Sequence, residues 1–134
     1  MAVKIMAEYI GDSRVKLEHG PSRDRIITDL PVDNGGKGRK FSPSDLLAAS
    51  LSSCILTIMS KVAQKENVNF CGCTIETEKY MKQSPRMVEK LKCIIRLKCK
   101  VPANLKQKFL ACVKTCPVHR SLHPDIRIEF EIKD

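Results

Sequence analysis

The segment Ser42–Val62, SPSDLLAASLSSCILTIMSKV, is the part of the chain around which the fold is organised. Ser42 is a typical N-cap residue, Pro43 suits the first helical position, and Asp45 stands where a capping box places an acid. Apolar residues then recur at spacings of three and four, which is the pattern of one helical face: Leu47, Leu51, Cys54, Ile55, Ile58 and Val62. We therefore predict a helix over about residues 43–65, which is long for a chain of 134 residues.

Cys54 lies in the middle of this predicted helix, and its local sequence allows two interpretations. A cysteine between Leu51 and Ile58 can be a small hydrophobic residue of the core. It can also be a nucleophile, but the field of the helix fades beyond the first turn, so a cation from another segment would have to activate the thiol. The segment alone leaves both interpretations open.

Alternating segments on both sides of the helix predict strands. Residues 3–17 alternate around a Gly11–Asp12 turn and predict a hairpin, and a short strand follows within residues 24–32. Beyond the helix, strands are predicted within residues 74–81, 88–101 and 126–133.

A second helix is expected after Pro102, and Pro117 should end or kink it. Its apolar side holds Leu105, Phe109, Cys112, Val113 and Cys116. Residues 33–40 are rich in glycine and charge and predict a loop. We expect a single α+β domain over residues 1–134, in which antiparallel sheets cover one or two central helices.

Composition limits the class of protein. No uninterrupted apolar run approaches the roughly 18 residues of a membrane span, and the N-terminus alternates like a strand without the apolar core of a signal peptide. These features predict a soluble, cytoplasmic protein without a membrane partner. The net charge is +9, and residues 51–134 carry 16 Lys and Arg against 8 Asp and Glu. Because aromatic residues are scarce and the lysines alternate with apolar residues, we expect a solvated basic face rather than a nucleic-acid site.

The chain holds seven cysteines, an odd number that argues against a disulfide framework. Cys93 and Cys99 alternate with lysines along a strand and are predicted to lie in the core, as is Cys112. Cys71 and Cys73 are one residue apart and lack further ligands at metal-binding spacing. The histidines at positions 19, 119 and 123 do not complete such a set, so no metal is expected.

Two distant motifs together resemble the OsmC/Ohr family of thiol peroxidases. They are FSPSDLLAASLSSC, residues 41–54, and CPVHRSL, residues 116–122. The sequence VDNGGKG, residues 32–38, is similar to the OsmC-like branch of that family. The resemblance covers nearly the whole chain. It implies an intertwined homodimer of α+β subunits, with two active sites that each contain residues of both chains.

The resemblance also implies roles for the two motif cysteines. Cys54 would be the peroxidatic cysteine that attacks an organic hydroperoxide and becomes a sulfenic acid. Cys116 would be the resolving cysteine that forms a disulfide with it. An external dithiol would reduce this disulfide, and no cofactor is implied.

The activating residues follow less directly from the resemblance. The family places an arginine of the N-terminal strands near the reactive thiol, and we assign this role to Arg14, with alternatives at positions 23, 25 and 39. Better-studied branches carry a glutamate where this chain has Ser44. The neighbouring Asp45 is a candidate catalytic acid, but it also fits a helix cap. His119 follows the resolving cysteine and is either a proton-transfer group or a surface residue.

Three functions therefore remain open at this stage. The first is a cysteine-based peroxidase that reduces organic hydroperoxides in a stress response. The second is a binding or scaffold protein of the same fold with a reactive thiol, which the missing glutamate keeps open. The third is a basic nucleic-acid-associated domain, which would show salt-sensitive retention on heparin or RNA.

Overall fold

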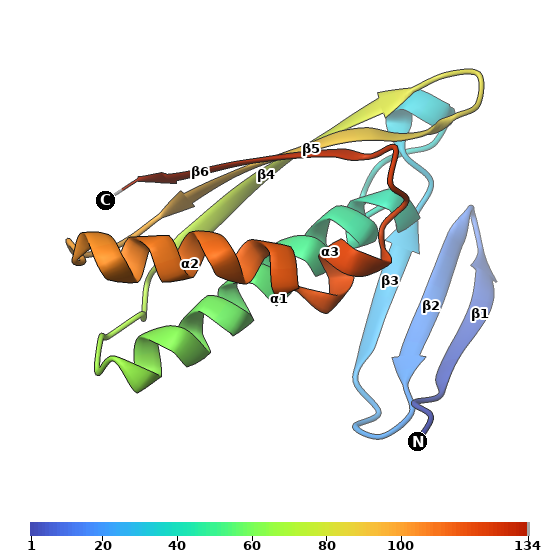
Figure 1. Ribbon diagram of the computed structural model, residues 1–134. Coiled ribbons are helices and arrows are strands. Elements are labelled where there is room, and N and C mark those ends of the chain that lie inside the picture. The colour runs from blue at the N-terminus through green and yellow to red at the C-terminus, as the bar shows by residue number, and fades with distance from the viewer. Residues whose placement is uncertain (134) are drawn as a thin grey trace. The chain divides into compact units, whose positions relative to one another are not determined.

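The computed structural model describes residues 1–133, which fall into two compact units (Figure 1). The first unit comprises Met1–Leu46, and the second begins at Leu47. The prediction of a single domain stays a prediction, and each unit is described by itself.

The first unit contains a three-stranded antiparallel sheet in the order β1–β2–β3. Its elements are β1 Ile5–Gly11, β2 Arg14–His19, β3 Arg25–Asp29 and the 3-10 turn η1 Val32–Asn34. Asp12 and Ser13 connect β1 to β2 with φ angles of 55° and 61°, as a tight hairpin turn requires. The predicted hairpin is therefore confirmed. The predicted loop over residues 33–40 is confirmed for residues 35–40, whereas residues 33 and 34 belong to η1.

The long helix α1 spans Pro43–Lys65, as predicted. Its first turn is closed by reciprocal hydrogen bonds of a capping box. The Asp45 amide donates to the Ser42 hydroxyl at 3.0 Å, and the Ser42 amide donates to the Asp45 carboxylate at 2.9 Å. These bonds satisfy amides that the helix itself leaves without partners.

The second unit combines a three-stranded sheet with helices. Its elements beyond α1 are β4 Thr74–Lys82, β5 Met87–Arg96, α2 Ala103–Thr115, α3 Pro117–Ser121 and β6 Arg127–Lys133. The sheet order is β4–β5–β6, with β4 antiparallel to β5. The expectation of purely antiparallel sheets is wrong here, because β6 runs parallel to β5. The connection through α2 and α3 crosses over and returns the chain in the same direction, as a parallel pair requires.

The core of the second unit lies between α1, α2 and one face of the sheet (Figure 1). Leu51, Ile55 and Met59 of α1 are fully buried against this core. The sheet contributes Val88, Leu91, Cys93 and Ile95, and α2 contributes Leu105, Phe109, Cys112 and Val113. The α+β class is thus confirmed, and so are the core positions predicted for Cys93 and Cys112.

The prediction for Cys99 is wrong. The alternation of apolar residues continues to Val101 in the sequence, but β5 ends at Arg96, and Cys99 is exposed. The partners of β5 end at the same level, since Arg96 pairs with Thr74 of β4 and with Lys133 of β6. A strand without neighbours on either side has no ladder to continue.

Within residues 1–133, α1 is the one helix that is long and apolar enough to cross a membrane by length and composition. The core helix of a soluble protein passes the same test. Because the apolar side chains of α1 pack into the core of the second unit, we interpret it as a core helix.

Candidate functional site

Cys54 and Cys116 are brought together within the second unit. Cys54 lies in the middle of α1 and is half-buried, whereas Cys116 lies between α2 and α3 and is fully buried. The two side chains are neighbours in the core of this unit, where Cys54 is one of the causes that raise the pKa of Cys116, although 61 residues separate them in the sequence. A disulfide between these two cysteines would link α1 to the junction of α2 and α3.

The position of Cys116 follows from the proline after it. Pro117 cannot continue α2, so the helix ends at Thr115 and Cys116 is extended, with φ −60° and ψ 123°. Cys116 then caps α3, and its Sγ accepts a hydrogen bond from the His119 amide at 3.5 Å. The ring of His119 packs against Phe130, with 6.3 Å between the ring centroids. His119 therefore contacts Cys116 through its backbone.

The environment of Cys116 favours the neutral thiol. Burial raises the pKa of Cys116, and the neighbouring Cys54 side chain raises it further, while hydrogen bonds from the amides of His119 and Val118 oppose both effects. Burial likewise raises the pKa values of Cys93 and Cys112, which makes them unreactive core residues.

The structure places Asp45 in the capping box described above. Ser44, at the position of the family's glutamate, has its hydroxyl 3.3 Å from that of Ser42. Helix capping is therefore observed for Asp45.

The four candidate arginines of the first unit differ in their partners. Arg23 and Arg25 both bind Glu18, at 3.1 and 2.7 Å. Arg39 binds Asp29 at 2.7 Å and Asp12 at 2.9 Å. Arg14 is different, because its buried Nε finds no hydrogen-bond partner within residues 1–133. Three candidates are thus engaged by carboxylates, and Arg14 is the one with an unused buried donor.

Sequence reasoning missed the role of Asp29. Its carboxylate is buried and accepts hydrogen bonds from the Arg39 side chain and from the amides of Arg39 and Leu30. The side-chain bonds with Arg39 are the largest cause that holds the pKa of Asp29 well below its ordinary value of 3.8. The Asp29–Arg39 pair joins the end of β3 to the end of the glycine-rich loop. The sequence offers only a weak signal for it, an acid at a strand end before a loop that contains arginine.

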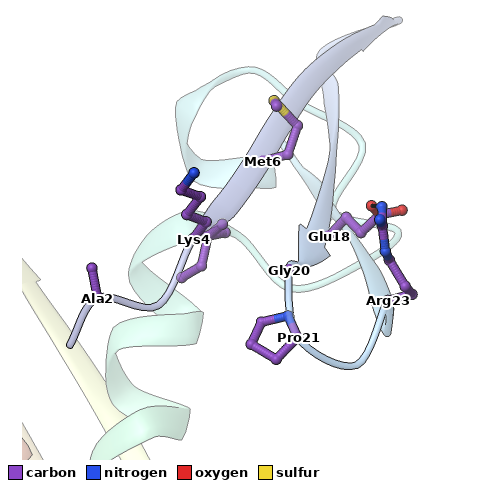
Figure 2. Close-up of a pocket in the computed structure, with 8 residues that line it drawn as sticks. Ala2, Lys4, Met6, Glu18, Gly20, Pro21 and Arg23 are labelled. Carbon is purple, nitrogen blue, oxygen red and sulfur yellow. Dashed lines mark hydrogen bonds and ion pairs between the residues drawn. The ribbon is translucent and has the colours of Figure 1, made fainter.

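An open cleft of about 650 Å³ lies in the first unit, beside β1 and the β2–β3 turn (Figure 2). Gly20 allows this turn to approach β1, because a Cβ there would lie 2.6 Å from the Lys4 carbonyl oxygen. The lining residues are Ala2, Lys4, Ile5, Met6, Glu18, Gly20, Pro21 and Arg23. None of them is a cysteine, so this cleft offers no thiol nucleophile.

No group of three His, Cys, Asp or Glu side chains that could hold a metal ion occurs in the part of the chain from residue 1 to 133.

Comparisons with known proteins give a consistent result. A family model described as OsmC-like protein matches residues 36–131. A Psychrobacter arcticus protein, provisionally named an osmotic stress induced and detoxification response protein, is 41% identical, with a TM-score of 0.92 over 96% of this chain and 93% of its own. None of the curated proteins searched matches this chain significantly.

More distant solved structures share the fold. An organic hydroperoxide resistance protein OsmC from Legionella pneumophila is 14% identical, with a TM-score of 0.79 over 100% of this chain and 98% of its own. The organic hydroperoxide resistance protein OhrB of Bacillus subtilis is 15% identical, with a TM-score of 0.68 over 99% of this chain and 98% of its own.

Proposed function

Since the chain belongs to the OsmC-like family, we propose that it is a thiol-dependent peroxidase that reduces organic hydroperoxides. The observation that carries the proposal is the contact between the Cys54 and Cys116 thiols. The names of the Legionella and Bacillus proteins, which refer to organic hydroperoxide resistance, support the choice of substrate.

The reaction uses both thiols in sequence. The Cys54 thiolate attacks one oxygen of the hydroperoxide, the O–O bond breaks, and the alcohol leaves with a proton while Cys54 becomes a sulfenic acid. The Cys116 sulfur then attacks the Cys54 sulfur. A disulfide forms, and the sulfenic hydroxyl leaves as water with the thiol proton of Cys116. An external dithiol returns both cysteines to the thiol state by exchange, and no cofactor takes part.

The burial of Cys116 suits this order of events. Burial raises the pKa of Cys116 and favours its neutral thiol, so it does not place a second negative charge next to the Cys54 thiolate. The apolar residues around Cys54 favour an alkyl hydroperoxide and protect the sulfenic acid from further oxidation.

We assign activation of Cys54 to Arg14 and to Asp45. A guanidinium can bind a thiolate and a carboxylate at once and stays charged at any physiological pH. The unused Nε of Arg14 supports this choice over the carboxylate-bound arginines. The active form is a cytoplasmic homodimer whose two sites contain residues of both chains.

Peptide mass spectrometry tests the proposal. The reduced protein receives one equivalent of cumene hydroperoxide, or of hydrogen peroxide as a control, and free thiols are then blocked. We expect a Cys54–Cys116 disulfide that forms faster with the organic peroxide. Free Cys54 and Cys116 after this treatment would contradict the proposal and favour a binding or scaffold role.

Two variants separate the roles of the cysteines. Cys54→Ser should abolish hydroperoxide consumption. Cys116→Ser should allow about one turnover, after which Cys54 is over-oxidised to the sulfinic acid. If neither change alters peroxide loss, the thiols do not perform this chemistry.

A matched pair of variants tests Arg14. Arg14→Gln should slow the oxidation of Cys54 at least about tenfold, the scale of one lost charge-assisted hydrogen bond. Arg23→Gln, which removes an exposed arginine bound to Glu18, should leave the rate unchanged. Equal rates for both variants would assign activation to another residue.

A further inference from the structure

A second pair of thiols lies outside the candidate site, in the turn Phe70–Cys73 before β4. The Cys73 amide donates to the Phe70 carbonyl at 3.2 Å, and Gly72 has a φ of 85°, which is the geometry of a type II turn. Cys71 is exposed and Cys73 is half-buried. The Cys71 amide also donates to the Asn69 side chain at 3.0 Å, which holds the turn in place.

The turn brings the Cα atoms of Cys71 and Cys73 within the separation that a disulfide can span. Residues two apart span at most about 7 Å when the chain is extended, and a turn brings them closer. Disulfides form at Cα separations of about 4.4–6.8 Å. A disulfide between two cysteines that are separated by one residue closes a strained ring. Strained and accessible disulfides exchange with other thiols more readily than buried structural disulfides do.

A cleft of about 370 Å³ opens directly beside Cys71. It is lined by Ser60, Gln64, Val68, Asn69, Phe70 and Cys71. Phe70 is anchored in the core by its ring contact with Phe109, with 5.6 Å between centroids. This shallow, open cleft therefore offers an apolar wall at Phe70, amide and hydroxyl groups, and an exposed thiol.

A lysine supplies positive charge at the turn. The Lys98 side chain lies so close to Gly72 that a Cβ there would be 2.6 Å from the Lys98 Cδ and 3.0 Å from its Nζ. The ammonium group thus sits beside the residue that separates Cys71 and Cys73. A cation in this place attracts an anionic reactant to the turn.

From this arrangement we propose that Cys71 and Cys73 form a second redox site, which exchanges with an anionic low-molecular-weight peptide disulfide bound in the adjacent cleft. The site is separate from the Cys54–Cys116 pair and does not depend on peroxidase activity.

The exchange proceeds in two balanced steps. The Cys71 thiolate attacks one sulfur of the small disulfide, whose S–S bond breaks, so that a mixed disulfide forms and one small thiolate leaves. The Cys73 thiolate then attacks the Cys71 sulfur, forms the Cys71–Cys73 bond and releases the second small thiolate. The two cysteines lose two electrons to the small disulfide, and their protons pass to the two released thiols.

The experiment uses the full chain carrying Cys54→Ser and Cys116→Ser, so that its result is independent of the proposed peroxidase. The reduced protein is mixed with oxidised glutathione, quenched with a thiol-blocking reagent at successive times and analysed by peptide mass spectrometry. We expect a Cys71–Cys73 disulfide, with two molecules of reduced glutathione released for each disulfide formed.

Single changes added to this protein identify the steps. Cys73→Ser should trap glutathione on Cys71. Cys71→Ser should leave Cys73 largely unmodified, because that thiol is half-buried. Cys99→Ser is the matched control, since Cys99 is also exposed, and it should change neither the product nor its rate.

Lys98→Met tests the charge, with Lys100→Met as its control. Oxidised glutathione should react at Cys71 faster than the cationic disulfide cystamine, and Lys98→Met should reduce this preference by about fivefold, the scale of one exposed charge pair. Modification of Cys71 no faster than that of Cys99, or a glutathione adduct that Cys73 does not resolve, would overturn the proposal.

Discussion

The two sheets of the molecule have the same number of strands but differ in what covers their apolar side chains. In the second unit, Leu91, Cys93 and Ile95 of β5 are fully buried beneath α1 and α2. In the first unit, Ile5 is 68% exposed and Ile26 is 46% exposed. Both sheets alternate apolar and polar residues, so the difference lies in their partners rather than in their patterns.

The difference indicates which unit supplies its own core. The second unit carries helices that bury one face of its sheet, whereas the first has only three strands and the turn η1 between residues 1 and 42. Exposed apolar side chains on a small sheet mark a surface that a further chain can cover. This observation supports the homodimer that we propose, and it predicts that substitutions in the two sheets have very different consequences.

The largest effect is expected at Leu91, the centre of the covered sheet. Leu91→Ala should lower the free energy of unfolding by about 2–5 kcal/mol, because it removes buried methyl groups and leaves a cavity. Urea denaturation measures this change. A loss below about 1 kcal/mol would mean that the core of the second unit is not as closely packed as the burial indicates.

A smaller effect, dependent on pH, is expected from the polar network of the first unit. Because Arg39 lowers the pKa of Asp29 below 3.8 in the folded chain, the pair stabilises the protein above about pH 4. That stabilisation is lost as the pH falls below this value and Asp29 is protonated. Arg39→Met should therefore lower the free energy of unfolding near neutral pH. The free energy of unfolding of this variant should also fall less steeply as the pH is lowered below about 4.

Urea denaturation at a series of pH values tests this expectation. The control is Lys133→Met, which removes an exposed lysine 3.8 Å from Glu131 and should leave the pH dependence unchanged. An unaltered acid decline in Arg39→Met would show that the Asp29–Arg39 pair does not set it.

Local signals allowed much of the fold to be predicted from the sequence. The capping residues Ser42 and Asp45 and the spacing of apolar residues are properties of one segment, and the helix bounds 43–65 are confirmed. The end of β5 was not predictable in this way, because it depends on where β4 and β6 end. The parallel direction of β6 was missed, since alternation is the same in both directions.

The candidate site could be predicted only in part for the same reason. Nothing in the spacing of Cys54 and Cys116 indicates that their thiols meet; the resemblance to a family suggested the pair, and the packing of the second unit brings them into contact. The Asp29–Arg39 pair and the Lys98 contact with Gly72 depend on neighbours in space that no local pattern reveals.

A third, smaller effect is expected at the helix cap that precedes the second unit. Ser42→Ala removes the hydroxyl that accepts a hydrogen bond from the Asp45 amide. This loss should lower the free energy of unfolding by about 1 kcal/mol. The control is Ser50→Ala, because the exposed Ser50 hydroxyl donates to the Leu47 carbonyl within the helix, and alanine has the higher helix propensity. Equal losses in the two variants would argue against a specific capping contribution.

The smallest effect on the folding of one chain is expected in the uncovered sheet. Ile26→Thr keeps a β-branched side chain at an exposed strand position and should change the unfolding free energy of the single chain by about 0.5 kcal/mol or less. Its effect should instead appear in assembly, because a polar group in a covered apolar surface weakens association. Sedimentation velocity over a range of protein concentrations should therefore show weaker self-association for Ile26→Thr than for the unaltered chain. Unfolding at low concentration should remain nearly the same for both proteins. A loss of stability comparable to that of Leu91→Ala, without a change in association, would mean that the first sheet is buried within its own chain and that the contrast between the two sheets is not real.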